Sequence, residues 1–448
     1  MAFFQFPGTR SANGGQRVPE IDRASWGVIL LAIMGMSYNA VLAAANAKGI
    51  NISFSAAAAV EIVLLSIGIC MALRTGLTTN EKNILYFFSL FIVTTLFISL
   101  FNQTIFVDGL RNMLLITVFT CLGRQINEKT IRLLFTLGSI IVLGFLILEM
   151  SSLSTYADLF KPALYFANSR GIAEFEYDET GLFKNTMGFE GRFSYGVFDG
   201  PRTSSLFLEQ VSLANWAAVL CILLLALWPR MNNKEKILQI FTIVLIVVSN
   251  NTRATSLLVL ASLVGYWLYP RLPKYTNAIV APLFILLGVV VYNLYPDAHE
   301  DDFIGRTSKT GKYLTKMAPE DYFGLGLNQL NHLWDSGYPW MVTATSVFGM
   351  IAVWMFISFI IPQSSAAQKR CAWGLTLYMF MNMLVSGNAT FSIKVSAAMW
   401  LLVGFMSGTK LILPSNAQAL NRRDDRGWSL PKPVAYVQTL QQHLRAKR

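Results

Sequence analysis

Two arginines beside apolar segments are the residues of this 448-residue chain whose type best suits binding chemistry. Arg202 stands just before a long apolar segment, and Arg253 follows Asn250-Asn251-Thr252 between two short apolar runs. A guanidinium group keeps its charge and pairs bidentately with phosphate oxygens. We therefore expect both arginines to bind a lipid-linked diphosphate at the outer mouth of a membrane bundle. The alternative is that each reaches out to lipid head groups.

A third arginine lies inside an apolar segment. Arg111 falls within 104–123, with Asp108 one turn earlier on the same helical face. An arginine in the bilayer costs about 2.5–3.5 kcal/mol on insertion scales, so it should pair or line a cavity. Either Asp108 and Arg111 form an ion pair that only orients the helix, or Arg111 is a functional residue.

Three side chains are candidates for a general base. Glu209 lies inside the apolar segment 205–228, where a carboxylate needs a basic partner or a chemical task. His332 and Asp335 are three residues apart and are predicted to share a helical face before the next segment. Each can accept a proton from a hydroxyl group. The alternatives are a surface histidine and an aspartate that caps the following helix.

The sequence contains no motif typical of metal binding, nucleotide binding or redox chemistry. Gly324-Leu-Gly326 lacks the strand, helix and lysine of a nucleotide-binding loop and predicts a turn. The histidines have no metal-ligand spacing, and no C-x-x-C pair occurs. We expect neither metal nor cofactor, and we expect the cysteines to be small buried residues: Cys70, Cys121, Cys221 and Cys371.

Composition places the chain in a membrane. It is 54% hydrophobic and 14% charged, whereas soluble domains average about 25% charged residues. The net charge of +11 fits basic cytoplasmic loops and a basic tail, so nucleic acid is not an expected partner. The first apolar run, 26–45, is longer than the core of a signal peptide and is predicted to be a membrane span.

The apolar runs predict an all-α polytopic membrane protein with about twelve transmembrane helices. The runs are 26–45, 54–73, 83–101, 104–123, 131–150, 205–228, 277–295, 339–361 and 372–388, with shorter ones at 237–249, 254–269 and 393–408. Two of the short runs meet at Ser249-Asn-Asn-Thr-Arg253. Polar backbone at membrane depth is tolerated only inside protein, so this junction should line a cavity.

Lysines and arginines in the short loops predict that both termini are cytoplasmic. Two long loops, about 151–204 and 296–338, then face outward. The predicted organisation is a cytoplasmic N-terminal segment, a transmembrane catalytic bundle and a cytoplasmic tail, over 1–25, 26–412 and 413–448.

The order and membrane placement of these motifs resemble the Wzy polysaccharide polymerase and O-antigen ligase superfamily. The matching stretches are Arg202-Thr-Ser-Ser-Leu-Phe-Leu-Glu209-Gln-Val-Ser212, Ser249-Asn-Asn-Thr-Arg253-Ala254, Arg306 ahead of Tyr322-Phe-Gly-Leu-Gly326, Asp335-Ser-Gly-Tyr338 and Phe348-Gly349. The resemblance implies a bundle of the GT-C type in the bacterial inner membrane. Such enzymes act on undecaprenyl-diphosphate-linked oligosaccharides without metal or nucleotide sugar.

The resemblance also implies roles for individual arginines. Arg202 and Arg253 would hold the diphosphate, with Arg111 and Arg306 as further candidates.

The base departs from the family pattern. Family ligases carry a His-Asn pair in the second long loop, and its histidine is the proposed base. Here that place reads Asp335-Ser336, and His332 lies one turn earlier. The base therefore stays open among Asp335, His332 and Glu209.

Two stretches favour an exopolysaccharide repeat-unit polymerase. One is Asp-Ser-Gly-Tyr. The other is Glu-Gln-Val-Ser, which resembles the Glu-Pro-Ser stretch of such polymerases but lacks its proline. Its expected partners are the lipid-linked oligosaccharide, membrane lipids, and chain-length regulator and export proteins. One alternative is an O-antigen ligase that transfers polysaccharide to lipid A core. The other is a transporter, which would show two pseudo-symmetric halves; no internal repeat is visible.

Overall fold

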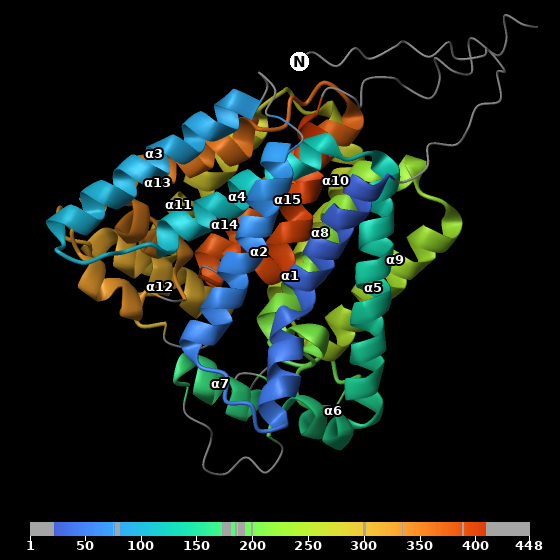
Figure 1. The fold of residues 1–448 in the computed structure, drawn as a ribbon. Coiled ribbons are helices and arrows are strands. Elements are labelled where there is room, and N and C mark those ends of the chain that lie inside the picture. Colours follow the sequence, from blue (N-terminus) through green and yellow to red (C-terminus); the bar gives the residue numbers. More distant parts are fainter. Residues whose placement is uncertain are drawn as a thin grey trace, which may run out of the picture. The chain divides into compact units, whose positions relative to one another are not determined.

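The computed structural model describes residues 22–408 except 75, 77–80, 173–180, 184–185, 187–192, 199, 299–301, 334 and 388, and every regular element among them is a helix (Figure 1). The α-helices are α1 (Arg23–Ala47), α2 (Phe54–Arg74), α3 (Lys82–Phe101), α4 (Asp108–Gln125), α5 (Glu128–Ser151), α6 (Leu153–Phe160), α7 (Pro162–Arg170), α8 (Gln210–Leu227), α9 (Asn233–Asn250), α10 (Arg253–Leu268), α11 (Val280–Leu294), α12 (Phe303–Lys316), α13 (Gly337–Phe359), α14 (Ala366–Val385) and α15 (Ile393–Ser407). Short 3-10 helices are η3 (Ser205–Phe207), η4 (Trp228–Arg230), η5 (Tyr269–Arg271), η6 (Thr276–Ile279), η7 (Asp321–Phe323), η8 (Leu327–His332) and η9 (Ala389–Phe391).

The helices coincide with the predicted spans. Each of the twelve apolar runs falls on one of α1–α5, α8–α11 and α13–α15. Within the described ranges, seven helices are long and apolar enough to cross a membrane: α1, α2, α3, α5, α8 with η4, α11 with η6, and α13. The chain is therefore a helical membrane protein. The predicted N-terminal segment and tail fall almost wholly outside the described residues.

Two helices form the core of the bundle. Nearly all of α8 and all of α15 are buried. α15 packs on α4 and α1, and α8 packs on α14, α9 and α10. A Cβ atom at Gly404 would lie 2.2 Å from the carbonyl oxygen of Thr120, and one at Gly123 would lie 2.3 Å from that of Leu401. Glycine on both helices thus lets the α4 and α15 backbones touch.

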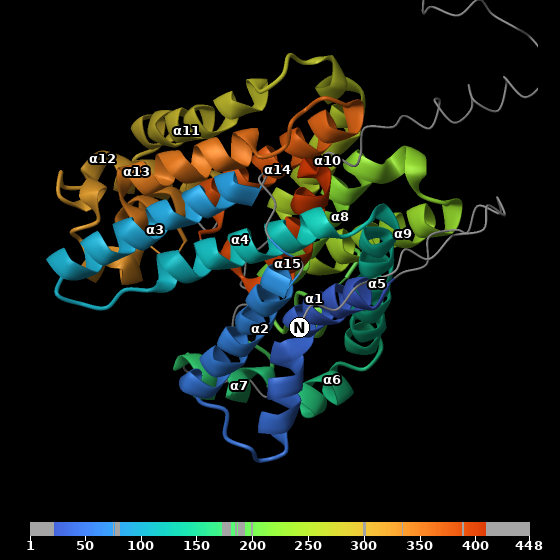
Figure 2. The ribbon, with the colours of Figure 1, turned by 45° about the horizontal axis from the view of Figure 1, so that its top comes forward.

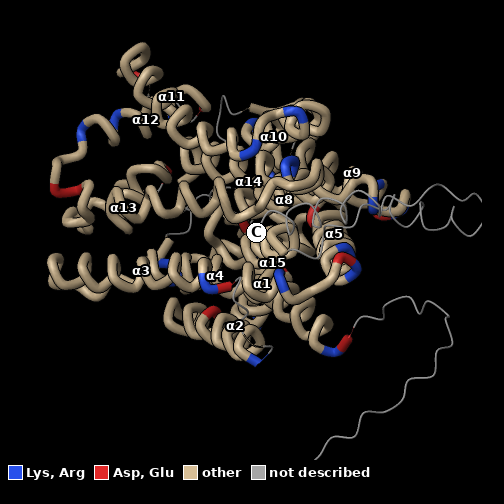
Figure 3. Tube along the Cα trace, turned by 90° about the horizontal axis from the view of Figure 1, so that it is seen from above, with Lys and Arg blue, Asp and Glu red and all other residues tan. Residues whose placement is uncertain are grey.

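The outer helices show the opposite pattern. Large apolar side chains are exposed along α2, α3, α10 and α11, for example Leu96, Leu263 and Leu286. Figure 3 shows the flanks of α3 and α11 nearly free of charged residues. Exposed apolar surface on this scale needs a cover, and lipid provides it.

The two long loops are partly helical. The first contains α6 and α7, which pack beneath the ends of α1, α2 and α5, as Figures 1 and 2 agree. The second contains α12, η7 and η8. Because the first loop ends in the short helix η3, α8 begins at Gln210 rather than at the predicted residue 205.

Candidate functional site

A buried carboxylate organises the end of the first long loop. Glu149 of α5 accepts hydrogen bonds from the backbone N–H of Ser204 at 2.9 Å and from that of Ser205 at 2.6 Å. The Ser204 hydroxyl donates to the same carboxylate at 3.0 Å. Leu208 then adopts a left-handed conformation with φ 60°. These contacts keep the backbone before Gln210 out of the α-helix, so α8 begins at Gln210 with Glu209 as its N-cap.

Glu209 lies between two cations. Lys394 Nζ of α15 is 2.7 Å from Glu209 Oε2, and Arg170 Nη1 of α7 pairs with Glu209 Oε1. The Ser212 hydroxyl donates to Oε2 at 3.0 Å. The Lys394 side chain is 0% exposed, so its ammonium group does not reach lipid head groups. Sequence reasoning predicted that Glu209 needs a basic partner, and the structure provides two.

Arg170 is the outer member of this group. Its side chain is 38% exposed, and its guanidinium carbon lies 4.8 Å from the centre of the Phe166 ring. Burial lowers the pKa of the guanidinium and the Glu209 carboxylate raises it; the net effect is a rise, so Arg170 stays charged. Arg170 therefore offers a fixed positive charge at the surface of the group.

A second ion pair adjoins this group. Arg111 Nη2 of α4 lies 2.5 Å from Glu61 Oε2 of α2, and the Tyr38 hydroxyl of α1 donates to the same carboxylate. Arg111 thus pairs with Glu61 and not with Asp108, so the alternative of an ion pair within one helix is wrong. The helix of Glu61, α2, packs on α7, the helix of Arg170. We call these five residues the Glu209 cluster: Glu61, Arg111, Arg170, Glu209 and Lys394.

The Arg202 and Arg253 motifs meet in the structure. Arg202 Nη2 donates to the carbonyl of Asn251 at 3.1 Å. Asn250 Nδ2 bridges the carbonyls of Thr203, at 2.6 Å, and Gln210, at 2.9 Å. The junction between α9 and α10 therefore closes onto the loop that leads into α8, one residue from Glu209.

This junction is buried inside the protein, and the prediction that it lines a cavity stays a prediction. Ser249 and Asn250 are each 1% exposed. Asn251 turns the chain with φ 53°, and α10 starts two residues later at Arg253. Arg253 itself is exposed, with its guanidinium carbon 4.8 Å from the centre of the Phe193 ring.

The remaining candidates lie in the second long loop. Asp335 is exposed, and its carboxylate is 3.7 Å from Lys309 Nζ of α12. His332 is exposed at the end of η8. Asp335 follows outside any helix, so the two do not share a helical face, and Ser336 rather than Asp335 stands at the N-cap of α13. The predicted turn at Gly324 is confirmed, with φ 79°.

Arg306 connects this loop to the rest of the bundle. Its Nη1 donates to the carbonyl of Val385 at 3.0 Å, where α14 ends. A Cβ atom at Gly337 would lie 2.8 Å from the carbonyl oxygen of Gly387. The turn from α14 to α15 therefore packs against the second loop at one end and leads to Lys394 at the other.

Four important residues escaped the sequence analysis: Glu61, Glu149, Arg170 and the buried role of Lys394. Charged residues inside apolar segments were the available signal for Glu61 and Glu149. Nothing local marks Arg170, because its partner is 39 residues away.

Cys121, Cys221 and Cys371 are buried as predicted, whereas Cys70 is exposed. Within the described part of the chain, no group of three or more His, Cys, Asp or Glu could hold a metal ion.

No protein-family model, curated protein or solved structure was found to match this chain. The class of protein defined by the fold is a helical membrane protein with a charged site inside its bundle.

The Glu209 cluster contains more cations than carboxylates. The side chains of Arg111 and Arg170 are partly exposed, and Arg253 is exposed. Fixed guanidinium groups of this kind bind anions with several oxygens, such as phosphate and diphosphate.

Proposed function

We propose that this protein is a metal-independent glycosyltransferase that polymerises undecaprenyl-diphosphate-linked oligosaccharide repeat units into exopolysaccharide. The observation that carries the proposal is the closure of the Arg202 motif onto the Asn251 backbone next to Arg253, adjoining the Glu209 cluster. Arginines grouped where helices end suit a substrate that is apolar at one end and a diphosphate in the middle. The family resemblance supplies the sugar chemistry.

The proposal includes a topology. Twelve helices, α1–α5, α8–α11 and α13–α15, cross the bacterial inner membrane in a bundle of the GT-C type. Both termini are cytoplasmic, and α6, α7 and α12 lie on the periplasmic side with the two long loops. This arrangement puts Arg202, Arg253 and Arg306 at the periplasmic leaflet, where lipid-linked repeat units are polymerised.

The reaction transfers the growing chain to a new lipid-linked unit. A terminal hydroxyl of the new unit loses its proton to a base, and its oxygen attacks the anomeric carbon of the growing chain. The bond from that carbon to the diphosphate oxygen breaks, and undecaprenyl diphosphate leaves. Arg202 and Arg253 stabilise the charge that develops on the leaving group.

The base is assigned among the three candidates by their surroundings. Both carboxylate oxygens of Glu209 accept from cations, which weakens their basicity. Glu209 therefore positions Arg170 and Lys394 in this proposal. Asp335 and His332 are exposed to an incoming hydroxyl, and Asp335 is the first choice because its place matches the ligase base.

A reconstituted assay tests the proposal. Purified protein in liposomes receives undecaprenyl-diphosphate-linked repeat units, and products are separated as a ladder. We expect Arg202→Ala and Arg253→Ala to lower the rate about 100-fold or more, the loss typical of one transition-state donor. Arg271→Ala is the matched control, because Arg271 is exposed like Arg253 and, like Arg202, donates to a backbone carbonyl, that of Trp267.

Three results would reject the proposal. Full ladders from both arginine variants would remove the diphosphate site. Transfer to lipid A core without a ladder would identify a ligase. Movement of lipid-linked units across the bilayer without a new glycosidic bond would identify a transporter.

A further inference from the structure

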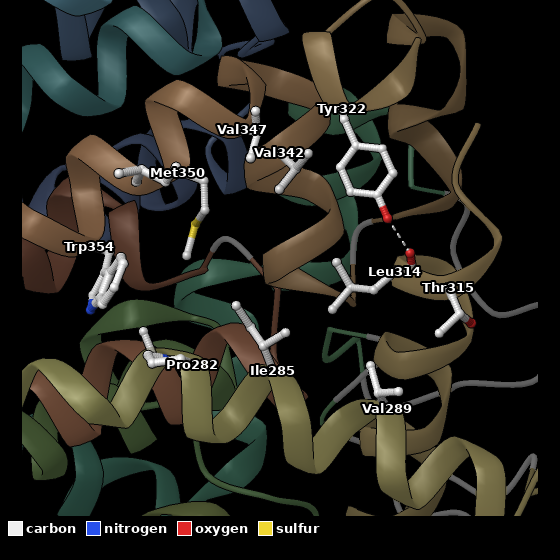
Figure 4. A pocket seen from close by; sticks show the side chains of 12 residues that line it. Pro282, Ile285, Val289, Leu314, Thr315, Tyr322, Val342, Val347, Met350 and Trp354 are labelled. Carbon is white, nitrogen blue, oxygen red and sulfur yellow. Dashed lines mark hydrogen bonds between the residues drawn. The ribbon is translucent and has the colours of Figure 1, made fainter. Parts of the chain in front are cut away.

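An apolar groove lies between α11 and α13, away from the Glu209 cluster. Its volume is about 520 Å³. Pro282, Ile285 and Val289 form one wall along α11, and Val342 and Met350 are among the α13 residues that form the other (Figure 4). Nearly all of these side chains are aliphatic, so the groove suits a hydrocarbon chain rather than a sugar.

A break in α13 shapes this groove. Ser346 has φ 64° and ψ 168° inside an otherwise helical stretch. On an uninterrupted helix, residues five apart point about 140° apart. Yet Val342 and Val347, on either side of the break, both line the groove. The break therefore turns the second half of α13 toward α11, and Val347, Met350 and Trp354 continue the apolar wall.

One end of the groove is polar. Thr315 of α12 and Tyr322 of η7 lie there, and the Tyr322 hydroxyl donates to the carbonyl of Leu314 at 2.6 Å (Figure 4). A Cβ atom at Gly311 would lie 2.0 Å from the carbonyl oxygen of Gly288. This close contact fixes α12 on α11, so the end of α12 stays at the polar end of the groove.

α12 brings positive charge to this end. It carries Arg306, Lys309, Lys312 and Lys316 and no carboxylate, and Figure 3 shows blue segments beside its label. Lys316 Nζ lies 5.9 Å from the centre of the Tyr292 ring on α11, one turn beyond Val289. The carboxylates that follow are Glu320, which is exposed, and Asp321, which is buried and accepts from the backbone N–H of Ala318. Cations therefore predominate at the groove's polar end.

We propose that this groove holds the polyprenyl chain of the second lipid-linked saccharide, the incoming unit, while Lys312 and Lys316 face its diphosphate. This inference rests on the proposed polymerase function, which needs two lipid carriers at once. Arg202 is held in place by its hydrogen bond to the buried α9–α10 junction. A fixed cation of this kind suits the diphosphate that leaves, because it stabilises the charge that develops there. Lys316 is exposed and held by no such junction, as suits a carrier that binds and leaves in every cycle. A cationic end and apolar walls along the rest of the groove match such a carrier, which joins an anionic diphosphate to a hydrocarbon chain.

Binding of undecaprenyl diphosphate tests the inference. The protein is placed in phosphatidylcholine nanodiscs, and bound carriers are counted by native mass spectrometry. We expect two equivalents for the unchanged protein and one for Ile285→Trp, in which the indole fills the groove. Leu286→Trp is the matched control, because Leu286 is on the same helix but 58% exposed, and it should keep both equivalents.

A second variant guards against misfolding of the first. Lys312→Gln/Lys316→Gln changes only side chains at the polar end, and we expect it to weaken the second equivalent roughly tenfold. In the polymerase assay, both variants should raise KM for the incoming unit and leave kcat largely unchanged. Arg202→Ala should instead lower kcat.

The outcomes separate the inference from the function on which it rests. Two equivalents retained by both groove variants would overturn the second site and leave the polymerase intact. If an equal amount of phosphatidylglycerol displaced the second equivalent of carrier, the groove would be a site for ordinary lipid, and the inference of a second carrier site would also be overturned. No carrier bound by the unchanged protein would reject the polymerase itself.

Discussion

Two groups of charges in this protein face opposite conditions. In the Glu209 cluster, Lys394 is fully buried and Glu209 is 16% exposed, and each depends on the other. In the second loop, Lys309 and Asp335 are 41% and 59% exposed and lie 3.7 Å apart. The side chains of the Glu209 cluster are held in place by their ion pairs. Lys309 and Asp335 are accessible to a substrate, because both are exposed to solvent.

The difference has an energetic basis. Removing one partner of a buried ion pair leaves an uncompensated charge in a medium that solvates it poorly. An exposed pair loses little, because solvent and salt screen both members. Changes of similar chemistry should therefore unfold the protein at one place and alter only its activity at the other.

The largest effect is expected at the centre of the cluster. Glu209→Gln leaves Lys394 buried without a counter-charge and should destabilise the protein by about 3–5 kcal/mol. Thermal unfolding in detergent measures the change. The double variant Glu209→Gln/Lys394→Met removes both charges and should regain much of the loss.

Glu320→Gln provides the control for that variant, because Glu320 is an exposed carboxylate of the second loop. It should change the melting temperature very little. Equal destabilisation by Glu209→Gln and Glu320→Gln would remove the distinction between the two regions.

A smaller effect is expected where the cluster reaches its rim. Arg111 is 39% exposed and Glu61 is 17% exposed, so Glu61→Gln should cost about 1–3 kcal/mol, the range for a lost charged hydrogen bond. The exchanged pair Glu61→Arg/Arg111→Glu should recover part of this loss in the same unfolding measurement.

Asp108→Asn is the matched control, because a pair of Asp108 with Arg111 was the alternative that the sequence left open. It should be silent. If Asp108→Asn destabilised the protein and Glu61→Gln did not, the pairing across α2 and α4 would be wrong.

The case of Arg111 shows what a sequence can and cannot predict here. Hydrophobic runs specify helices locally, so all twelve apolar segments were found as helices. An arginine in such a run implies a partner, because an unpaired charge in the bilayer is costly. Which carboxylate it meets depends on how α2 and α4 pack, and no periodicity carries that information.

The start of α8 shows the same limit. Apolar residues from 205 onward favour a helix, yet the carboxylate of Glu149 captures the N–H groups of Ser204 and Ser205. A contact between residues 55 positions apart thus overrides local preference. The same contact sets Glu209 at the helix N-cap, so the candidate site itself depends on a pairing that the sequence does not reveal.

The smallest effect on stability, and the sharpest on function, is expected at Asp335. Asp335→Asn breaks only an exposed pair with Lys309 and should change the free energy of unfolding by about 0–1 kcal/mol. If Asp335 is the base, the same change should abolish the polysaccharide ladder. Lys309→Gln breaks the same pair and should leave more activity than Asp335→Asn, so the two variants separate loss of the pair from loss of the base. A ladder that survives Asp335→Asn would transfer the role to His332, and His332→Ala would then be the variant without product. Destabilisation as large as that of Glu209→Gln would instead show that the second loop is as interlocked as the cluster.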